Sequence, residues 1–128
     1  MKMQLTREVT IRGIHNLENP KLSPAENESL YGICYGQHGH HYKVRVTIEG
    51  KIDSRSSLLM DRDALDRILR ENLVDPLDGK DLNRIFSNTS GEALAIAIYD
   101  RLKGPLPNLV RVGIQETRKN YFEYQSQS

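Results

Sequence analysis

The amino-acid sequence predicts an α+β domain, in which a four-stranded antiparallel sheet carries two helices over one face. Two segments of alternating apolar and polar residues come first, two segments with helical spacing follow, and two further alternating segments end the chain. Strands and helices that are segregated along a chain are typical of α+β domains, here in the order ββααββ. The length of 128 residues suits one domain, spanning residues 1–128.

The two N-terminal segments are predicted strands because their apolar residues recur at every second position. In "MKMQLTREVTI" the apolar face continues in register to His15. In "HGHHYKVRVTIEG" His38 and His40 continue the apolar face, whereas His41 falls on the opposite one. The segment between these strands is rich in Asn, Pro, Glu and Ser, which predicts a loop with one helical turn near Ser23.

Two helices are predicted next, each with its own start and stop signals. In "MDRDALDRILRENLVDPLD" Asp61 is the predicted N-cap, the leucines and isoleucine keep helical spacing, and Pro76 ends the helix. In "SGEALAIAIYDRLKGP" Ser90 is the predicted N-cap, and Gly104 with Pro105 ends the helix.

The remaining strands are predicted near the C-terminus. Val110, Val112 and Ile114 share one face, and "NYFEYQ" is the expected hairpin partner. Glu116 is a charged residue that continues the same face. One interpretation is that the strand runs out into solvent there. The other is that Glu116 is an inward carboxylate that accepts a pair of N–H groups from a heterocycle. Glu92 lies two residues after a helix cap, where a carboxylate suits the positive end of the helix dipole.

The bulk composition narrows the function classes. A formal charge of +1 gives no electrostatic bias toward nucleic acid or an anionic membrane. The single cysteine cannot form an intrachain disulfide, which fits a reducing compartment. The first residues lack the apolar core of a signal peptide, and no apolar run approaches the length of a membrane span. These observations predict a cytoplasmic protein.

The histidines form a candidate zinc site. His38 and His40 share a strand face, and His15 adds a third imidazole if the first two strands pair with that face in common. Three protein ligands plus an open position are typical of catalytic zinc. The alternative is a pair of partly buried histidines satisfied by hydrogen bonds. Cys34 is a fourth structural ligand, an inert buried thiol, or a nucleophile or base whose pKa a nearby cation lowers.

These residues resemble the 6-pyruvoyltetrahydropterin synthase and 6-carboxytetrahydropterin synthase family nearly end to end. The resemblance is carried by His15, "LSPAENESLYGIC", the pattern C-x3-H-G-H-x-Y, "DPLDGKDLN", "SGEALAIAIYDRL" and "ETRKN", in that order. It implies a tunnelling fold (T-fold), in which subunits join their sheets into a barrel and form a homo-hexamer, a dimer of trimers.

The resemblance also implies the chemistry of a lyase. It places a zinc ion on His15, His38 and His40, where it acidifies side-chain hydroxyls of 7,8-dihydroneopterin triphosphate. Cys34 would move a proton on the substrate side chain. The remaining implied residues are the catalytic Asp78 and the pterin-binding set Glu116, Glu92 and Ser90.

Two outcomes of this chemistry are known in the family. One branch eliminates triphosphate to give 6-pyruvoyltetrahydropterin, the biopterin precursor, and the other cleaves the side chain to give the 6-carboxy product used toward queuosine. Only three residues separate Cys34 from His38, as in the carboxy branch, whereas the loop after His15 resembles the pyruvoyl branch. We expect the carboxy type, with the pyruvoyl type as the alternative.

One departure from the family pattern concerns the proton relay. The family carries an Asp-His pair in "L-D-H-K-x-L", but here the segment is "LDGKDL", so Asp78 is kept and Gly79 replaces the histidine. A missing general acid or base costs about 10²- to 10⁴-fold in rate. The enzyme then works slowly or through another group, has shifted to a related pterin, or is a pterin- and zinc-binding paralogue. Ile11 and Gly13 are smaller departures, at positions that hold Phe and Ala in the family.

Overall fold

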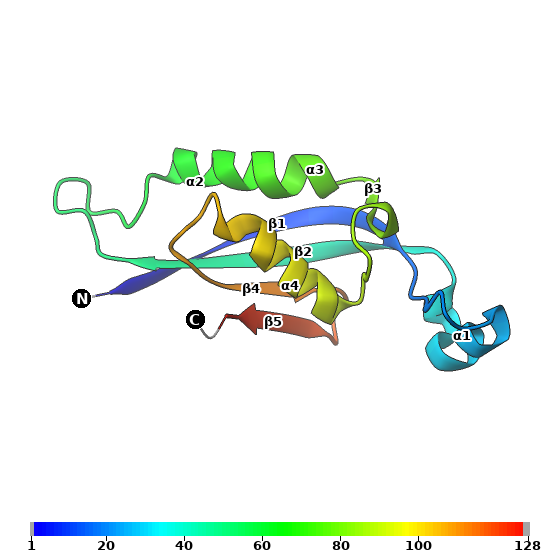
Figure 1. Ribbon diagram of the computed structural model, residues 1–128. Helices are drawn as coiled ribbons and strands as arrows, with labels where there is room; N and C mark the ends of the chain where they lie inside the picture. Colours follow the sequence, from blue (N-terminus) through cyan, green and yellow to red (C-terminus); the bar gives the residue numbers. More distant parts are fainter. Residues whose placement is uncertain (1, 127–128) are drawn as a thin grey trace.

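A computed structural model describes residues 2–126 of the chain. One sheet runs through the whole molecule, with the strand order β3-β1-β2-β4-β5 (Figure 1). All neighbours in it are antiparallel except β3, which lies parallel to β1. Its strands are β1 (Met3–His15), β2 (His38–Gly50), β3 (Lys80–Asp81), β4 (Leu109–Gln115) and β5 (Tyr121–Gln125).

The helices pack over one face of this sheet, apart from α1, which lies beyond the end of the sheet where β2 begins (Figure 1). The α-helices are α1 (Pro24–Tyr31), α2 (Arg62–Leu69), α3 (Asp75–Leu77) and α4 (Gly91–Lys103). A π-helical turn, Arg70–Val74, joins α2 to α3, and 3₁₀ turns occupy Gly32–Tyr35 and Leu82–Arg84. None of the helices in the described residues is long and apolar enough to cross a membrane.

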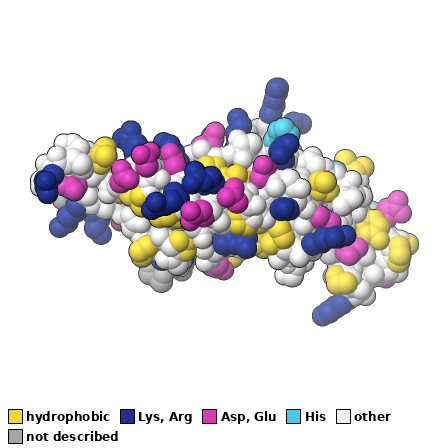
Figure 2. Space-filling view, turned by 90° about the horizontal axis from the view of Figure 1, so that it is seen from above, with side chains coloured by type: hydrophobic (Ala, Val, Ile, Leu, Met, Phe, Trp, Pro, Cys, Tyr) yellow, Lys and Arg dark blue, Asp and Glu magenta, His cyan; other side chains and the backbone are white. Residues whose placement is uncertain are grey.

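The hydrophobic core lies between the sheet and the helices. The inward residues of β2, Tyr42, Val44, Val46 and Ile48, are each at most 1% exposed. They pack in one cluster with the leucines of α2 and the following turn and with the inner face of α4. Each such side chain contributes about 1.5–3 kcal/mol when fully buried. The outer face of α2 and α3 carries Lys or Arg side chains interspersed with Asp or Glu (Figure 2).

The predicted order ββααββ and the predicted caps are confirmed. The side chains of Asp61 and Ser90 accept hydrogen bonds from the backbone N–H groups of Ala64 and Ala93, at 3.1 and 3.2 Å. The helical turn predicted near Ser23 is a complete helix, α1, which a capping box at Ser23 begins.

Three local predictions were wrong. The sheet has a fifth strand, β3, which has only two residues and therefore leaves no periodic pattern in the sequence. The first long helix does not stop at Pro76 but continues to Leu77. Because proline has no N–H for the carbonyl four residues earlier, the wider π-helical turn that precedes it allows the chain to pass through.

The third correction concerns the face of β4. Val110 was predicted to point inward, yet it is only half-buried, whereas Leu109 is 3% exposed. The register explains this, because Thr47 pairs with Arg111 but Ile48 pairs with Leu109. Val110 is thus the extra residue of a β-bulge, and the alternation resumes beyond it.

Gly91 permits the close approach of α4 to the sheet. A Cβ atom built on Gly91 would collide with the ring of Phe122 and would lie 3.1 Å from Glu116 Oε2. We expect Gly91→Ala to lower the free energy of unfolding by about 1–3 kcal/mol, because a crowded packing site cannot accept a methyl group. Urea denaturation measures this change.

Gly104→Ala is the matched control, because a Cβ on Gly104 would meet nothing within 4 Å. Its φ of −62° suits alanine, so we expect its free energy of unfolding to stay unchanged or to rise by less than about 1 kcal/mol. Equal destabilisation by the two substitutions would contradict the packing argument.

Candidate metal centre

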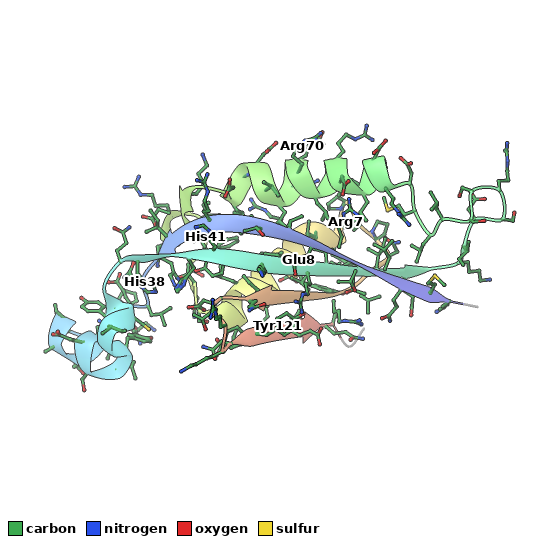
Figure 3. The ribbon with its side chains drawn as sticks, turned by 180° about the vertical axis from the view of Figure 1, so that it is seen from behind. Arg7, Glu8, His38, His41, Arg70 and Tyr121 are labelled. Carbon is green, nitrogen blue, oxygen red and sulfur yellow. The ribbon has the colours of Figure 1, made fainter. Side chains whose placement is uncertain are left out.

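Three histidines and one carboxylate converge at the end of the central strand pair. His15 lies directly opposite His38 in the β1–β2 register, and His40 faces the same side two residues further along β2. Glu116 follows the last residue of β4. The nitrogen and oxygen atoms that these four side chains offer lie within 4.8 Å of one another. Figure 3 shows His38 at the end of β2 nearest to α1.

The histidine rings are packed edge to face. The ring centroids of His15 and His38 are 4.5 Å apart, those of His15 and His40 are 5.0 Å apart, and those of His38 and His40 are 4.8 Å apart. The three imidazoles therefore surround one small volume.

Backbone carbonyls orient two of the rings. Nδ1 of His15 lies 2.8 Å from the carbonyl oxygen of Thr89, and Nδ1 of His38 lies 2.7 Å from the carbonyl oxygen of Gly36. A carbonyl oxygen accepts hydrogen bonds and donates none, so Nδ1 carries the proton in each ring. In a neutral imidazole Nε2 then presents its lone pair to the cluster. A backbone acceptor behind the imidazole is typical of metal-binding histidines.

The Nε2 atoms of His15 and His40 are buried, and no described residue forms a hydrogen bond with them. Glu116 Oε1 lies 3.2 Å from His40 Nε2 and 3.8 Å from His15 Nε2, close enough for charge interaction, but without the geometry of a hydrogen bond. Buried polar atoms are almost always partnered, so these nitrogens indicate that a group belongs between them.

Burial favours the neutral, metal-binding form of two histidines. Loss of solvation lowers the pKa of His15, and this effect outweighs the opposing hydrogen bond to the Thr89 carbonyl. Burial likewise lowers the pKa of His40, against the attraction of the Glu116 carboxylate. A metal competes with protons for these nitrogens, so a lowered pKa helps binding. The residues present therefore fit a metal ion.

Cys34 does not belong to this cluster. It is half-buried in the 3₁₀ turn Gly32–Tyr35, and its carbonyl oxygen accepts a hydrogen bond of 2.8 Å from the N–H of Leu17. That bond ties the turn to the segment that follows β1. The fourth potential ligand is Glu116, so the interpretation of Cys34 as a structural ligand is not supported.

Asp78 is engaged by Arg12 rather than by an imidazole. Its Oδ1 accepts a hydrogen bond of 2.7 Å from the backbone N–H of Arg12, and the Arg12 guanidinium donates to both carboxylate oxygens at 3.4 Å. The backbone bond, then the side-chain bonds, lower the pKa of Asp78, and the nearby His41 contributes to the same shift. His41 lies opposite Arg12 in the register, on the face away from the metal cluster.

Gly79 adopts a backbone conformation that suits glycine. Its φ is +76°, and its N–H donates a hydrogen bond of 2.7 Å to the carbonyl oxygen of Arg12. An added Cβ would have room, since the nearest atom is Arg12 Nη2 at 4.0 Å, but the left-handed conformation would be strained.

The other two predicted site residues lie at the start of α4. Ser90 caps the helix and follows Thr89, whose carbonyl holds His15, so the cap lies beside the cluster. Glu92 is exposed and lines a separate groove of about 320 Å³ between α4 and β5. Within the described residues, nothing brings Glu92 to the histidines.

Two supporting features were missed from the sequence. Thr89 is 1% exposed, and its hydroxyl donates to the carbonyl oxygen of Asn16 at 3.2 Å, which connects the segments that hold His15. Tyr42 is fully buried beneath the cluster, with its ring centroid 5.4 Å from that of His40. Its hydroxyl has no hydrogen-bond partner, and burial strongly raises its pKa. The alternation of β2 indicates only that Tyr42 faces inward, not where its hydroxyl lies.

Two cavities flank the cluster. The larger, of about 550 Å³, is lined by His40, His41, Arg12, Gly79 and neighbouring backbone. The second, of about 330 Å³, is lined by Glu116 together with His41, Lys43 and Arg118. Both cavities are lined by His41, on the other face of the sheet, and each reaches the cluster at one member only, His40 or Glu116.

Comparison with known proteins gives a consistent result. The family model described as 6-pyruvoyl tetrahydropterin synthase matches residues 4–127. The 6-pyruvoyl tetrahydrobiopterin synthase of Dictyostelium discoideum is 35% identical over 129 residues, covering 96% of this chain and 96% of that protein. The human protein of the same name is 33% identical over 135 residues, covering 97% and 92%. The solved structure of Caenorhabditis elegans 6-pyruvoyl tetrahydropterin synthase superposes with a TM-score of 0.91 at 28% identity, covering 99% and 97%.

These relatives do not support the expected 6-carboxy type, since their names are those of pyruvoyl enzymes. The short gap between Cys34 and His38 has a structural explanation instead. Cys34 lies in the 3₁₀ turn that ends at Tyr35, and directly after this turn the Gly36 carbonyl holds the His38 ring. With the T-fold architecture and the family both matched along almost the whole chain, this protein belongs to the 6-pyruvoyl tetrahydropterin synthase family, a family of lyases.

Proposed function

We propose that the protein is a zinc-dependent lyase that eliminates triphosphate from 7,8-dihydroneopterin triphosphate to give 6-pyruvoyltetrahydropterin. The observation that carries this proposal is the convergence of three imidazoles on one small volume, with the two buried Nε2 atoms of His15 and His40 unpartnered. The pyruvoyl type is favoured over the carboxy type by the names of the relatives.

Zinc suits the donor set, because imidazole nitrogens and a carboxylate are among its usual ligands. His15, His38 and His40 would hold it, and bound zinc would supply a Lewis acid for the hydroxyls of the substrate side chain. The backbone acceptors at Thr89 and Gly36 fix the two rings, so little reorganisation is needed on binding.

The chain supplies the proton transfer and the ring recognition. Cys34 would take and return a proton on the substrate side chain. Glu116 would accept the N–H pair of the pterin ring beside the start of α4, to which Ser90 and Glu92 belong. Asp78 keeps the position of the family's relay carboxylate, with Arg12 bound to it.

We further propose that the active form is a homo-hexamer in the cytoplasm, made from this one domain. Both outer strands, β3 and β5, are sheet edges in a single chain. Edges left unpaired favour the addition of further strands, as the joining of sheets into a barrel requires.

A second candidate is a pterin- and zinc-binding paralogue with weak or no lyase activity. Gly79 favours it, because no side chain at this position can relay a proton, and its φ of +76° shows a backbone adapted to glycine.

The product assay decides between these candidates. Zinc-loaded protein incubated with dihydroneopterin triphosphate should release inorganic triphosphate and a pterin with the mass of 6-pyruvoyltetrahydropterin. We expect Cys34→Ala to lower the rate by about 10²- to 10⁴-fold, since it removes the proton carrier. Its zinc content should stay unchanged, because Cys34 lies outside the cluster. Intact zinc and pterin binding without turnover in the unsubstituted protein would favour the paralogue.

The contribution of the missing relay is tested at Gly79. We expect Gly79→His to turn over faster than the unsubstituted protein and to lose about 1–2 kcal/mol of stability, because a side chain strains a left-handed residue. Gly79→Ala is the matched control, since it carries the same strain without an imidazole. Equal rates for the two variants would show that the relay does not limit turnover.

Removal of the metal should make the stability of the protein depend on the protonation of the buried histidines. We expect chelation to lower the melting temperature but to leave the protein folded, because the hydrophobic core is formed by other side chains than the metal ligands. The lowered pKa values of His15 and His40 mean that, below the ordinary value of 6.5, the unfolded chain binds more protons than the folded one. The metal-free protein should therefore lose stability as the pH falls from about 6.5 through these lowered values.

Melting curves of the metal-free protein between pH 5 and 8 measure this slope. His15→Gln should flatten it, whereas His41→Gln should keep it, because His41 lies exposed on the opposite face. A slope that His15→Gln leaves unchanged would show that other groups cause it.

A further inference from the structure

Glu116 lies nearer to the metal ligands than a residue that only recognises a heterocycle needs to be. Its Oε1 is 3.2 Å from His40 Nε2 and 3.8 Å from His15 Nε2, so this oxygen belongs to the same small volume as the imidazole nitrogens. Two ligands of one tetrahedral zinc, each about 2.0–2.1 Å from it, are separated by a similar distance.

A fourth ligand changes what the centre can do. Three imidazoles leave one position open for a substrate hydroxyl, whereas three imidazoles and a carboxylate form a closed set of four, which is typical of structural sites. The proposed function requires an open position. Glu116 must therefore leave the metal before the side chain of a substrate can bind to it.

The Glu116 carboxylate has a second possible position, away from the metal. Glu116 lines the cavity of about 330 Å³ as well as the cluster, so its side chain borders both. Its Oε2 already lies beside Gly91, the first residue of α4, at the positive end of a helix dipole. The side chain of Glu116 is 18% exposed.

Tyr42 adds a polar group next to the cluster. Its hydroxyl is buried and has no hydrogen-bond partner among the described residues. The rings of Tyr42 and His40 are in contact.

We propose that Glu116 is a displaceable fourth ligand, which closes the metal site at rest and opens it when the N–H pair of a pterin ring draws the carboxylate away. This inference rests on the proposed function and adds a coupling to it. Charge-assisted hydrogen bonds from the ring compensate for the lost coordination bond. A molecule that lacks such an N–H pair leaves the centre closed, so recognition of the ring controls access of hydroxyls to the metal.

The test uses the full chain loaded with Co²⁺, whose visible absorption depends on the number and type of its ligands. We expect the addition of pterin, which has the ring but not the triphosphate side chain, to change the Co²⁺ spectrum of the unsubstituted protein. We expect Glu116→Gln to weaken Co²⁺ and Zn²⁺ binding by at least about 10- to 100-fold, the loss typical of even an outer-shell partner. Pterin should leave the spectrum of this variant unchanged. Competition with a chelator measures the affinities.

Glu123→Gln is the matched control, because Glu123 lies on the same hairpin but pairs with Arg111 at 3.3 Å. It should bind metal as the unsubstituted protein does. Equal metal affinity in Glu116→Gln and Glu123→Gln, or a Co²⁺ spectrum of the unsubstituted protein that pterin does not change, would overturn the inference. The spectral change in the unsubstituted protein needs no variant, so a folding defect cannot conceal the answer.

Failure of this inference is distinguishable from failure of the proposed function. Turnover of dihydroneopterin triphosphate together with unchanged metal affinity in Glu116→Gln would retain the lyase and reject the displaceable ligand. Absence of turnover together with the expected loss of metal affinity in Glu116→Gln would reject the lyase and retain the displaceable ligand.

Discussion

The antiparallel pairing of β1 with β2 is the constraint on which the rest of the structure depends. The two strands match over thirteen residues, from Met3 opposite Gly50 to His15 opposite His38. This register turns one face of both strands toward the helices and places the histidines at the end of the same face. A slip by one residue would turn the apolar residues and the histidines of one strand to the wrong side. Core formation and assembly of the metal cluster therefore require the same register.

The cluster lies where the apolar core ends. Tyr42 is the last large core side chain of β2, and the next two inward positions are His40 and His38. Burial against the core lowers the pKa of His15 and of His40, and cavities border His40 and Glu116. A site at the boundary between a dry interior and a cavity combines buried ligands with access for a substrate.

Local backbone geometry, rather than side-chain chemistry alone, explains the departures from the family pattern. Gly79 combines a left-handed conformation with a hydrogen bond to Arg12, so the loop after α3 is fixed to β1 without a relay histidine. Asp78, which remains, is held by the same arginine. The carboxylate is thereby kept ionised and oriented, although the imidazole that would share its proton in the family is absent.

The sequence by itself determined the four longer strands, the two long helices, their N-caps and the common face of His15, His38 and His40, because periodicity and capping are local properties of the chain. It also carried the family resemblance. Only the tertiary structure decided how close Glu116 comes to the imidazoles, since this distance depends on the pairing of β4 with β2 and on the approach of α4 at Gly91. It also showed that Arg12 holds Asp78 and that Glu92 lies in a separate groove. Such contacts join residues far apart in the chain, and no local pattern encodes them.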